Sequence, residues 1–170
     1  EAVRLLRLIT DTTSAYLHAQ ADAGAQALML FDSWVGLLDA PDFDRFAAPL
    51  LEQIFAGLEH LDLPLLYFPR GSAHLLERVS SFQVDVVGID WRTALTRARA
   101  VLGTDVTLQG NLDPAALFAP RDRLEQRIDH VLRQAGEGRH VFNLGHGIEP
   151  ATDPDSVAFL VDTVHAKTAG

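Results

Sequence analysis

The stretch Val141-Phe142-Asn143-Leu144-Gly145-His146-Gly147-Ile148 joins an apolar run to a histidine that stands between two glycines. Its apolar beginning predicts a short buried strand, and its two glycines allow backbone angles and close approaches that a side chain would block. His146 then lies at the carboxyl end of that strand, where an imidazole can donate, accept or titrate near neutral pH. A lone histidine at a strand end more commonly bonds its own loop, so a functional role for His146 depends on the rest of the chain.

The same pattern, an apolar strand followed by a polar tip, occurs four more times. The additional strands are predicted over residues 26–31, 64–68, 84–89 and 106–108. Apolar residues at helical spacing predict helices over residues 3–23, 43–61, 74–79, 93–102, 124–135 and 154–164. Asp153 is expected to cap the last helix, with Pro154 in its first turn. No linker or low-complexity segment interrupts this alternation, which predicts a single domain over residues 1–170.

Strands that are apolar on both faces and alternate with amphipathic helices are typical of parallel βα units. Five such units fit an open doubly wound sheet or most of a (β/α)₈ barrel, and the pattern alone does not choose between them. Both folds place their chemistry at the carboxyl ends of the strands. The candidate site is therefore expected at five polar tips, which are Asp32-Ser33, Arg70-Gly71, Asp90-Trp91, Gln109 to Asp113, and Asn143 to His146.

The composition limits the function classes. The chain of 170 residues is 48% hydrophobic and carries a formal net charge of -9, with a pI near 5.1. Because no basic cluster offsets this charge, a nucleic-acid partner is not expected, whereas a small anionic ligand held by a few local donors is compatible with the sequence. The lack of cysteine excludes disulfides and cysteine nucleophiles and fits a cytoplasmic protein. No apolar run approaches the roughly 18 residues that span a membrane.

Several familiar catalytic motifs are missing. There is no Gly-x-Gly-x-x-Gly after a strand, no phosphate-binding loop, no Gly-x-Ser-x-Gly elbow and no His-Glu-x-x-His motif. A metal site built from this chain is not expected, because most histidines are scattered over predicted helices or their ends and belong at the surface. These are His18, His60, His74, His130 and His165.

Four of the tips together resemble a known family. Phe31-Asp32-Ser33, Gly88-Ile89-Asp90-Trp91, Gln109-Gly110-Asn111-Leu112-Asp113-Pro114 and Asn143-Leu144-Gly145-His146-Gly147 occur in the order and approximate spacing of uroporphyrinogen decarboxylases. The resemblance runs from the first helix to Val164-His165, and the last two motifs together are fairly specific.

This resemblance implies a distorted (β/α)₈ barrel that acts as a homodimer without metal or organic cofactor. Such enzymes remove the carboxyl groups of the four acetate side chains of uroporphyrinogen III, giving coproporphyrinogen III on the route to haem. The chain resembles the carboxy-terminal part, about the last five βα units. Helical periodicity begins at Glu1 without an N-cap, as expected for a longer chain cut there. The family's arginine-bearing motif, its pyrrole-binding aspartate and a later tyrosine would lie upstream, so the chain alone is expected to be inactive.

The resemblance also assigns site residues. His146 is expected to contact the substrate's acid side chains and to help proton movement, and Ser33 to hydrogen-bond a substrate carboxylate. The alternative for Ser33 is a helix N-cap or turn residue. Phe31 is expected either to flank the macrocycle or to fill the barrel core.

The remaining tips carry weaker expectations. A structural role in turns is favoured for Asp90, Gln109, Asn111 and Asp113. Arg70 is a candidate carboxylate clamp, since guanidinium groups bind carboxylates through two donors. Trp34 and Trp91 are expected to be packing anchors.

Two alternatives remain. One is a related barrel that transfers methyl groups to or from corrinoid or thiol carriers, although such proteins typically hold zinc through histidine and cysteine, and this chain has no cysteine. The other is a non-catalytic tetrapyrrole-binding module or assembly subunit. In either case a five-stranded open sheet leaves two edges and one apolar face exposed, so pairing with another chain or with a missing half is expected.

Overall fold

The computed structural model describes residues 1–169. Five parallel strands form one sheet: β1 (Leu28–Asp32), β2 (Leu65–Pro69), β3 (Val86–Gly88), β4 (Thr107–Leu112) and β5 (His140–Leu144). The α-helices are α1 (Ala2–Asp22), α2 (Ala40–Asp42), α3 (Ala48–Leu58), α4 (Leu76–Val79), α5 (Leu95–Leu102), α6 (Arg121–Ala135) and α7 (Pro154–Thr168). The predicted alternation of strands and helices is confirmed.

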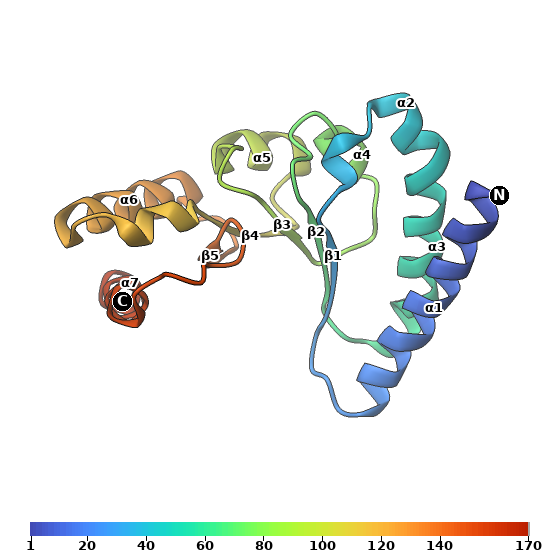
Figure 1. The fold of residues 1–170 in the computed structure, drawn as a ribbon, viewed down its shortest axis with the longest axis horizontal. Helices are drawn as coiled ribbons and strands as arrows, with labels where there is room; N and C mark the ends of the chain where they lie inside the picture. The colour runs from blue at the N-terminus through green and yellow to red at the C-terminus, as the bar shows by residue number, and fades with distance from the viewer. Residues whose placement is uncertain (170) are drawn as a thin grey trace.

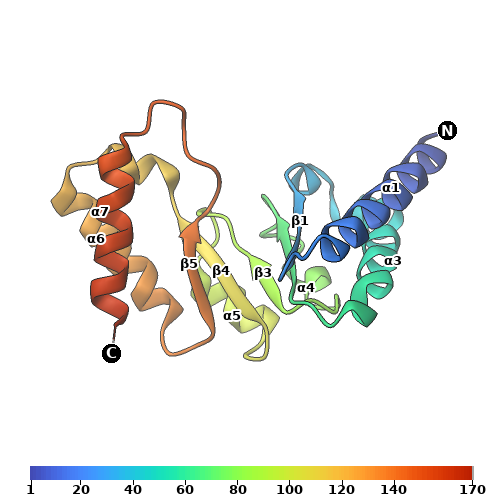
Figure 2. The same ribbon diagram turned by 90° about the horizontal axis from the view of Figure 1, so that it is seen from below.

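The strand order distinguishes between the two folds that the sequence allowed. The strands follow one another as β1-β2-β3-β4-β5, without the reversal of order at which a doubly wound sheet binds its ligand. The helices are arranged along the convex side of the curved sheet, with α1 and α3 beyond β1 and with α6 and α7 beyond β5 (Figures 1 and 2). This arrangement is five consecutive units of a (β/α)₈-type barrel.

The hydrophobic core lies between the sheet and these outer helices. Around β2, the buried rings of Phe55, Tyr67 and Phe82 contact one another with centroids 5.4–5.8 Å apart. Near β4, Leu108 and Leu112 belong to the same buried cluster as Ile128 of α6. The core therefore fixes the sheet from outside and leaves the carboxyl ends of the strands free to carry polar residues.

Two of the differences from the sequence prediction have a clear structural cause. Strand β4 continues to Leu112 instead of ending at residue 108, because Asn111 and Leu112 stay paired with Asn143 and Leu144 of β5. The helix predicted over 43–61 is interrupted by a π-helical turn, η2 (Phe43–Ala47), ahead of α3. Pro49 has no amide hydrogen to continue the regular ladder there, which is a common cause of such interruptions.

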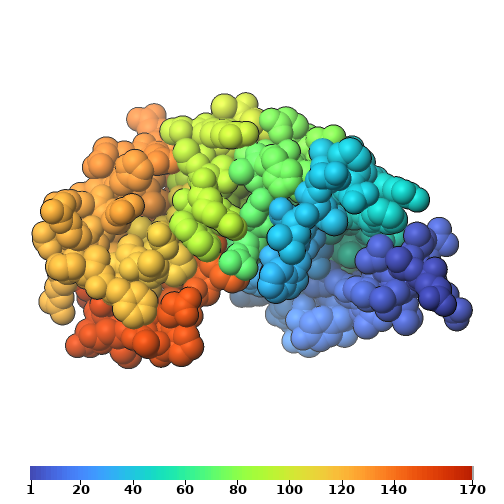
Figure 3. Space-filling view, turned by 45° about the horizontal axis from the view of Figure 1, so that its top comes forward, coloured from blue at the N-terminus to red at the C-terminus, as the bar shows by residue number. Residues whose placement is uncertain are grey.

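The concave face of the sheet is open. Phe31 of β1 is 65% exposed and Val141 of β5 is 45% exposed, although both lie in strands of a barrel. The space-filling view shows an arch with a hollow between the N-terminal helices and the C-terminal segment (Figure 3). A groove of about 570 Å³ with apolar walls also runs beside α1, α3 and residues 34–38. The exposed apolar face expected for half a barrel is therefore present.

Within residues 1–169, each helix is either too short or too polar to cross a lipid bilayer.

Candidate active site

The loop after β1 lies against the end of β2. The Arg70 amide donates to the Asp32 carbonyl over 3.1 Å, and the Gly36 amide donates to the Arg70 carbonyl over 3.2 Å. A Cβ on Gly36 would lie 2.6 Å from the Arg70 carbonyl oxygen, so only glycine permits this approach. Ser33 is therefore held in a loop that is fastened to Arg70.

The side chain that caps this loop is Asp32. The Val35 amide donates to Asp32 Oδ1 over 3.2 Å, and the Tyr67 hydroxyl donates to Asp32 Oδ2 over 3.2 Å. Burial raises the pKa of Asp32, while these hydrogen bonds act in the opposite direction. Burial, followed by the neighbouring Asp32 charge and hydrogen bond, also raises the pKa of Tyr67. Because Asp32 makes the capping bond, the turn does not require Ser33 for that purpose.

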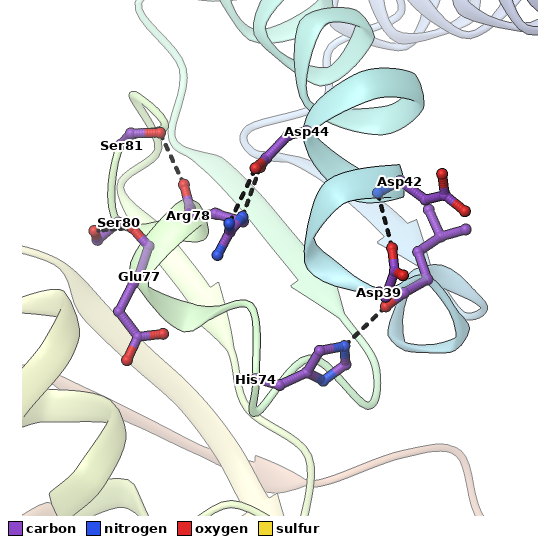
Figure 4. Close-up of polar contacts among 9 residues, drawn as sticks. Asp39, Asp42, Asp44, His74, Glu77, Arg78, Ser80 and Ser81 are labelled. Carbon is purple, nitrogen blue, oxygen red and sulfur yellow. Dashed lines mark hydrogen bonds and ion pairs between the residues drawn. The ribbon is translucent and has the colours of Figure 1, made fainter.

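The same loop is fastened from outside to the segment that follows β2. Arg78 donates to both carboxylate oxygens of Asp44, over 2.6 and 3.0 Å, and His74 Nε2 donates to the Leu38 carbonyl over 2.8 Å (Figure 4). The contact with a carbonyl places the proton of His74 on Nε2. These bonds join the segment between β1 and α3 to the segment that follows β2.

Asp90 joins the ends of β2 and β3. Its Oδ2 accepts hydrogen bonds from the Gly71 amide over 2.6 Å and from Arg92 Nη2 over 2.8 Å, and its Oδ1 accepts from the Arg92 amide over 2.9 Å. The side chain of Asp90 is only 2% exposed. It is thus a buried carboxylate with its hydrogen-bonding capacity used by the protein, as expected for a structural role.

Asn111 makes the equivalent connection between β3 and β4. Its Nδ2 donates to the carbonyl of Asp90 over 3.0 Å and to that of Thr93 over 2.6 Å. Asp113 caps the short helix η4 (Pro114–Phe118) by accepting from the Ala115 amide over 2.9 Å. Asp113 therefore has the structural role in a turn that the sequence favoured, whereas Asn111 has a structural role inside strand β4 and not in a turn. Gln109 instead points across the sheet, with Nε2 4.0 Å from Met29 Sδ.

The segment that follows β5 passes over the end of β4 and approaches the residues that follow β3. The Gly145 amide donates to the Leu112 carbonyl over 2.7 Å, and a Cβ on Gly145 would lie 2.4 Å from the Trp91 amide nitrogen. The close approach expected at Gly145 is confirmed. A Cβ on Gly147 would meet no heavy atom within 4 Å, so the same expectation for Gly147 is wrong, because the chain has turned into open space there.

This crossing places His146 beside two aromatic rings. Its imidazole stacks on Phe68 with centroids 6.2 Å apart and on Trp91 with centroids 6.5 Å apart. Phe68 in turn contacts Phe31 edge to face at 5.9 Å. Because Phe31 and His146 both contact Phe68, these two predicted site residues lie on one face, with Ser33 two residues beyond Phe31.

Of the aromatic residues around His146, Phe68 is the one that sequence reasoning missed. It is buried and follows an apolar run, so it was indistinguishable from a core residue. The available signal was its position one residue before Pro69 and Arg70, at the very end of a strand. The expectation that Trp34 is a packing anchor is wrong. Its side chain is 71% exposed, because the neighbouring Val35 is the residue that turns into the core.

No group of three or more histidine, cysteine, aspartate or glutamate side chains that could hold a metal ion occurs among residues 1–169. The groups at this edge are an imidazole, aromatic rings and guanidinium groups, with the Ser33 hydroxyl in the adjoining loop after β1. Such a set can bind acidic groups carried by an apolar ring system and can exchange protons with it.

Comparison with known proteins identifies the family. The family model described as uroporphyrinogen decarboxylase (URO-D) matches residues 1–167. The chain belongs to the uroporphyrinogen decarboxylase family. This agrees with the resemblance of the strand-end motifs.

Individual relatives agree with this result. The uroporphyrinogen decarboxylase of Syntrophotalea carbinolica is 45% identical over 166 residues, covering 97% of this chain and 48% of that protein. That of Myxococcus xanthus is 46% identical over 164 residues, covering 96% of this chain and 47% of that protein. The chain thus spans about half the length of these curated relatives.

A solved structure supports the fold. A methyltransferase from Methanosarcina mazei superposes with a TM-score of 0.80 at 21% identity, covering 93% of this chain and 47% of that one. At this level of identity the likeness concerns the fold alone. The uroporphyrinogen decarboxylase family is thus identified by sequence, and the five-unit barrel segment by structure.

Proposed function

We propose that the complete protein that contains this chain decarboxylates the four acetate side chains of uroporphyrinogen III to give coproporphyrinogen III. The observation that carries the proposal is the position of His146, whose imidazole stacks on Phe68 and on Trp91, on the face that also carries Phe31. Membership of the uroporphyrinogen decarboxylase family supplies the reaction.

The chemistry explains why such groups are needed. Loss of carbon dioxide from an acetate arm would leave a carbanion, whereas prior protonation of the adjacent pyrrole carbon turns the ring into an electron sink. The protein must therefore hold the acid side chains and provide a route for protons. Positioned donors and proton transfer are the usual means, and proton transfer contributes about 10²–10⁴-fold to the rate.

Each residue has a part in this scheme. His146 donates a hydrogen bond to a substrate carboxylate and assists proton movement, and Ser33 donates to a second carboxylate. Phe31, whose ring is exposed on the open face, flanks the macrocycle. The carboxylate that accepts hydrogen bonds from the pyrrole N–H groups comes from a part of the barrel beyond these five units. We further propose a cytoplasmic homodimer that needs no cofactor.

The test uses the full-length protein. Uroporphyrinogen III supplied under reducing conditions should release four molecules of carbon dioxide, in keeping with its four acetates. His146→Ala should lower kcat/KM by about 10²–10⁴-fold. His165→Gln is the matched control, because His165 is exposed on α7, and it should retain wild-type activity.

The other outcomes separate the alternatives. Tight binding of the macrocycle without release of carbon dioxide would replace the proposal with a non-catalytic module. Bound zinc together with methyl transfer would replace it with a methyltransferase. Full activity of His146→Ala would remove His146 from the site while leaving the reaction in place.

A further inference from the structure

Two guanidinium groups flank Trp91, and they differ in what balances their charge. Arg92 Cζ lies 5.0 Å from the centroid of the ring and Arg70 Cζ lies 6.0 Å from it. Arg92 is paired, because its Nη2 lies 2.8 Å from Asp90 Oδ2. Within residues 1–169, Arg70 has no carboxylate partner among the ion pairs, and its Nε is buried without a hydrogen bond.

The backbone of Arg70 is fixed on both sides. Its amide donates to Asp32 and its carbonyl accepts from Gly36, and the next amide, that of Gly71, donates to the buried carboxylate of Asp90. The side chain therefore starts from a rigid position between the Ser33 loop and Trp91. Trp91 stacks on His146, so the Arg70 guanidinium lies beside the row of proposed site residues.

A buried, charged donor without an acceptor is unfavourable and is uncommon in folded proteins. Asp90, a buried carboxylate at this edge, already accepts from Gly71 and Arg92. The acceptor for Arg70 therefore comes from outside the described residues. A planar guanidinium beside an aromatic ring favours a carboxylate, which it binds through two parallel hydrogen bonds.

We propose that Arg70 binds a carboxylate of the macrocycle's acidic side chains, alongside His146 and Ser33. The proposal rests on the proposed function, which supplies a substrate with eight carboxylates. Arg70 then contributes affinity for the substrate, and its interaction is the same before and during the reaction. Losing it should raise KM and leave kcat nearly unchanged.

The experiment compares Arg70→Gln and Arg70→Lys in the full-length protein. Arg70→Gln should raise KM for uroporphyrinogen III by about 10–100-fold, the range for a charged hydrogen-bonded pair, with kcat within about 3-fold of wild type. Arg70→Lys keeps the positive charge but lacks the two parallel donors of the guanidinium. Its KM should therefore rise less than that of Arg70→Gln. Arg121→Gln is the control, because Arg121 also lies over an aromatic ring, that of Phe159, but on the outer helices, and it should leave KM unchanged.

A second measurement separates this proposal from the proposed function. Binding of uroporphyrin, the oxidised macrocycle with the same carboxylates, can be followed by its fluorescence and requires no turnover. Weaker binding by Arg70→Gln, by about 10–100-fold, supports the assignment even if the wild-type protein releases no carbon dioxide. An unchanged KM and unchanged binding, together with a lower melting temperature, would show that Arg70 pairs with a carboxylate of the protein and would overturn it. A fall in kcat at constant KM would overturn it as well.

Discussion

At the scale of single residues, the site depends on how closely the backbone at Gly145 approaches the Asp90–Trp91 peptide. The space there is smaller than a methyl group, since a Cβ would lie 2.4 Å from the Trp91 amide nitrogen. His146 is the next residue, so its stacking on Phe68 and on Trp91 depends on this contact. The two glycines that surround His146 are alike in the sequence but differ in what they contact.

Gly145→Ala should therefore lower the stability of the full-length protein by about 1–3 kcal/mol, the usual cost of overpacking, and should displace His146. Gly147→Ala should have little effect, because its Cβ would face open space. Thermal unfolding and steady-state kinetics of the two variants test this pair. Equal effects of the two substitutions would contradict the predicted difference.

The sequence predicted some of these residues and not others. The apolar run before Gly145 and the polar tip after it located His146 correctly at a strand end. Nothing local indicated that Asp90 would be buried or that Phe68 would contact His146, because both depend on loops that are distant in the sequence. Polar tips that serve as structural connections have the same residue types as those that bind ligands.

At the scale of elements, β1 and β2 are joined by a buried pair as well as by their backbones. The Tyr67 hydroxyl donates to Asp32, and burial raises the pKa of Asp32 above its ordinary value of 3.8. A carboxyl with a raised pKa binds its proton more tightly in the folded state. Its contribution to stability is therefore present at low pH and is lost as the pH rises through the raised pKa.

Asp32→Asn should remove this dependence. Relative to the variant, the wild-type protein should lose stability as the pH rises from about 3.5 toward neutrality. Urea unfolding at a series of pH values measures the free energy of unfolding of both proteins. A difference between them that does not change with pH would contradict the raised pKa. Tyr67→Phe is the companion variant: it should cost about 1–2 kcal/mol at neutral pH, because the buried carboxylate loses one donor.

The elements themselves were largely predictable. Continuous apolar runs indicated all five strands, and helical spacing indicated the helices between them. The end of β4 was missed because pairing with β5, rather than the side chains of Asn111 and Leu112, extends it. The interruption at η2 was missed because the apolar spacing continues through residues 43–47.

At the scale of the whole molecule, the chain forms an arch rather than a closed barrel. The concave face carries exposed apolar side chains, among them Phe31 and Val141, and a closed barrel would cover them. Strand order, not composition, decides that the fold is of barrel type, and only the arrangement in space reveals that order. The expectation of one domain over residues 1–170 stays a prediction.

A polypeptide of these 170 residues alone should not decarboxylate uroporphyrinogen III. Its open face lacks walls to exclude water, and the proposed pyrrole-binding carboxylate lies outside it. Carbon dioxide release by the purified polypeptide and by the full-length protein provides the comparison. Turnover by the shorter polypeptide would refute this division of roles.

The bonds that join Gly71 to Asp90, Asp90 to Asn111, and Gly145 to Leu112 also bear on the speed of ligand exchange. The protein makes these bonds with its own groups, so the entropy of ordering the four loops that follow β2 to β5 is lost during folding and not on each encounter. These loops would need little rearrangement when a macrocycle binds. Association would then depend on diffusion and orientation, and the lifetime of the complex on how many acid groups are held at once.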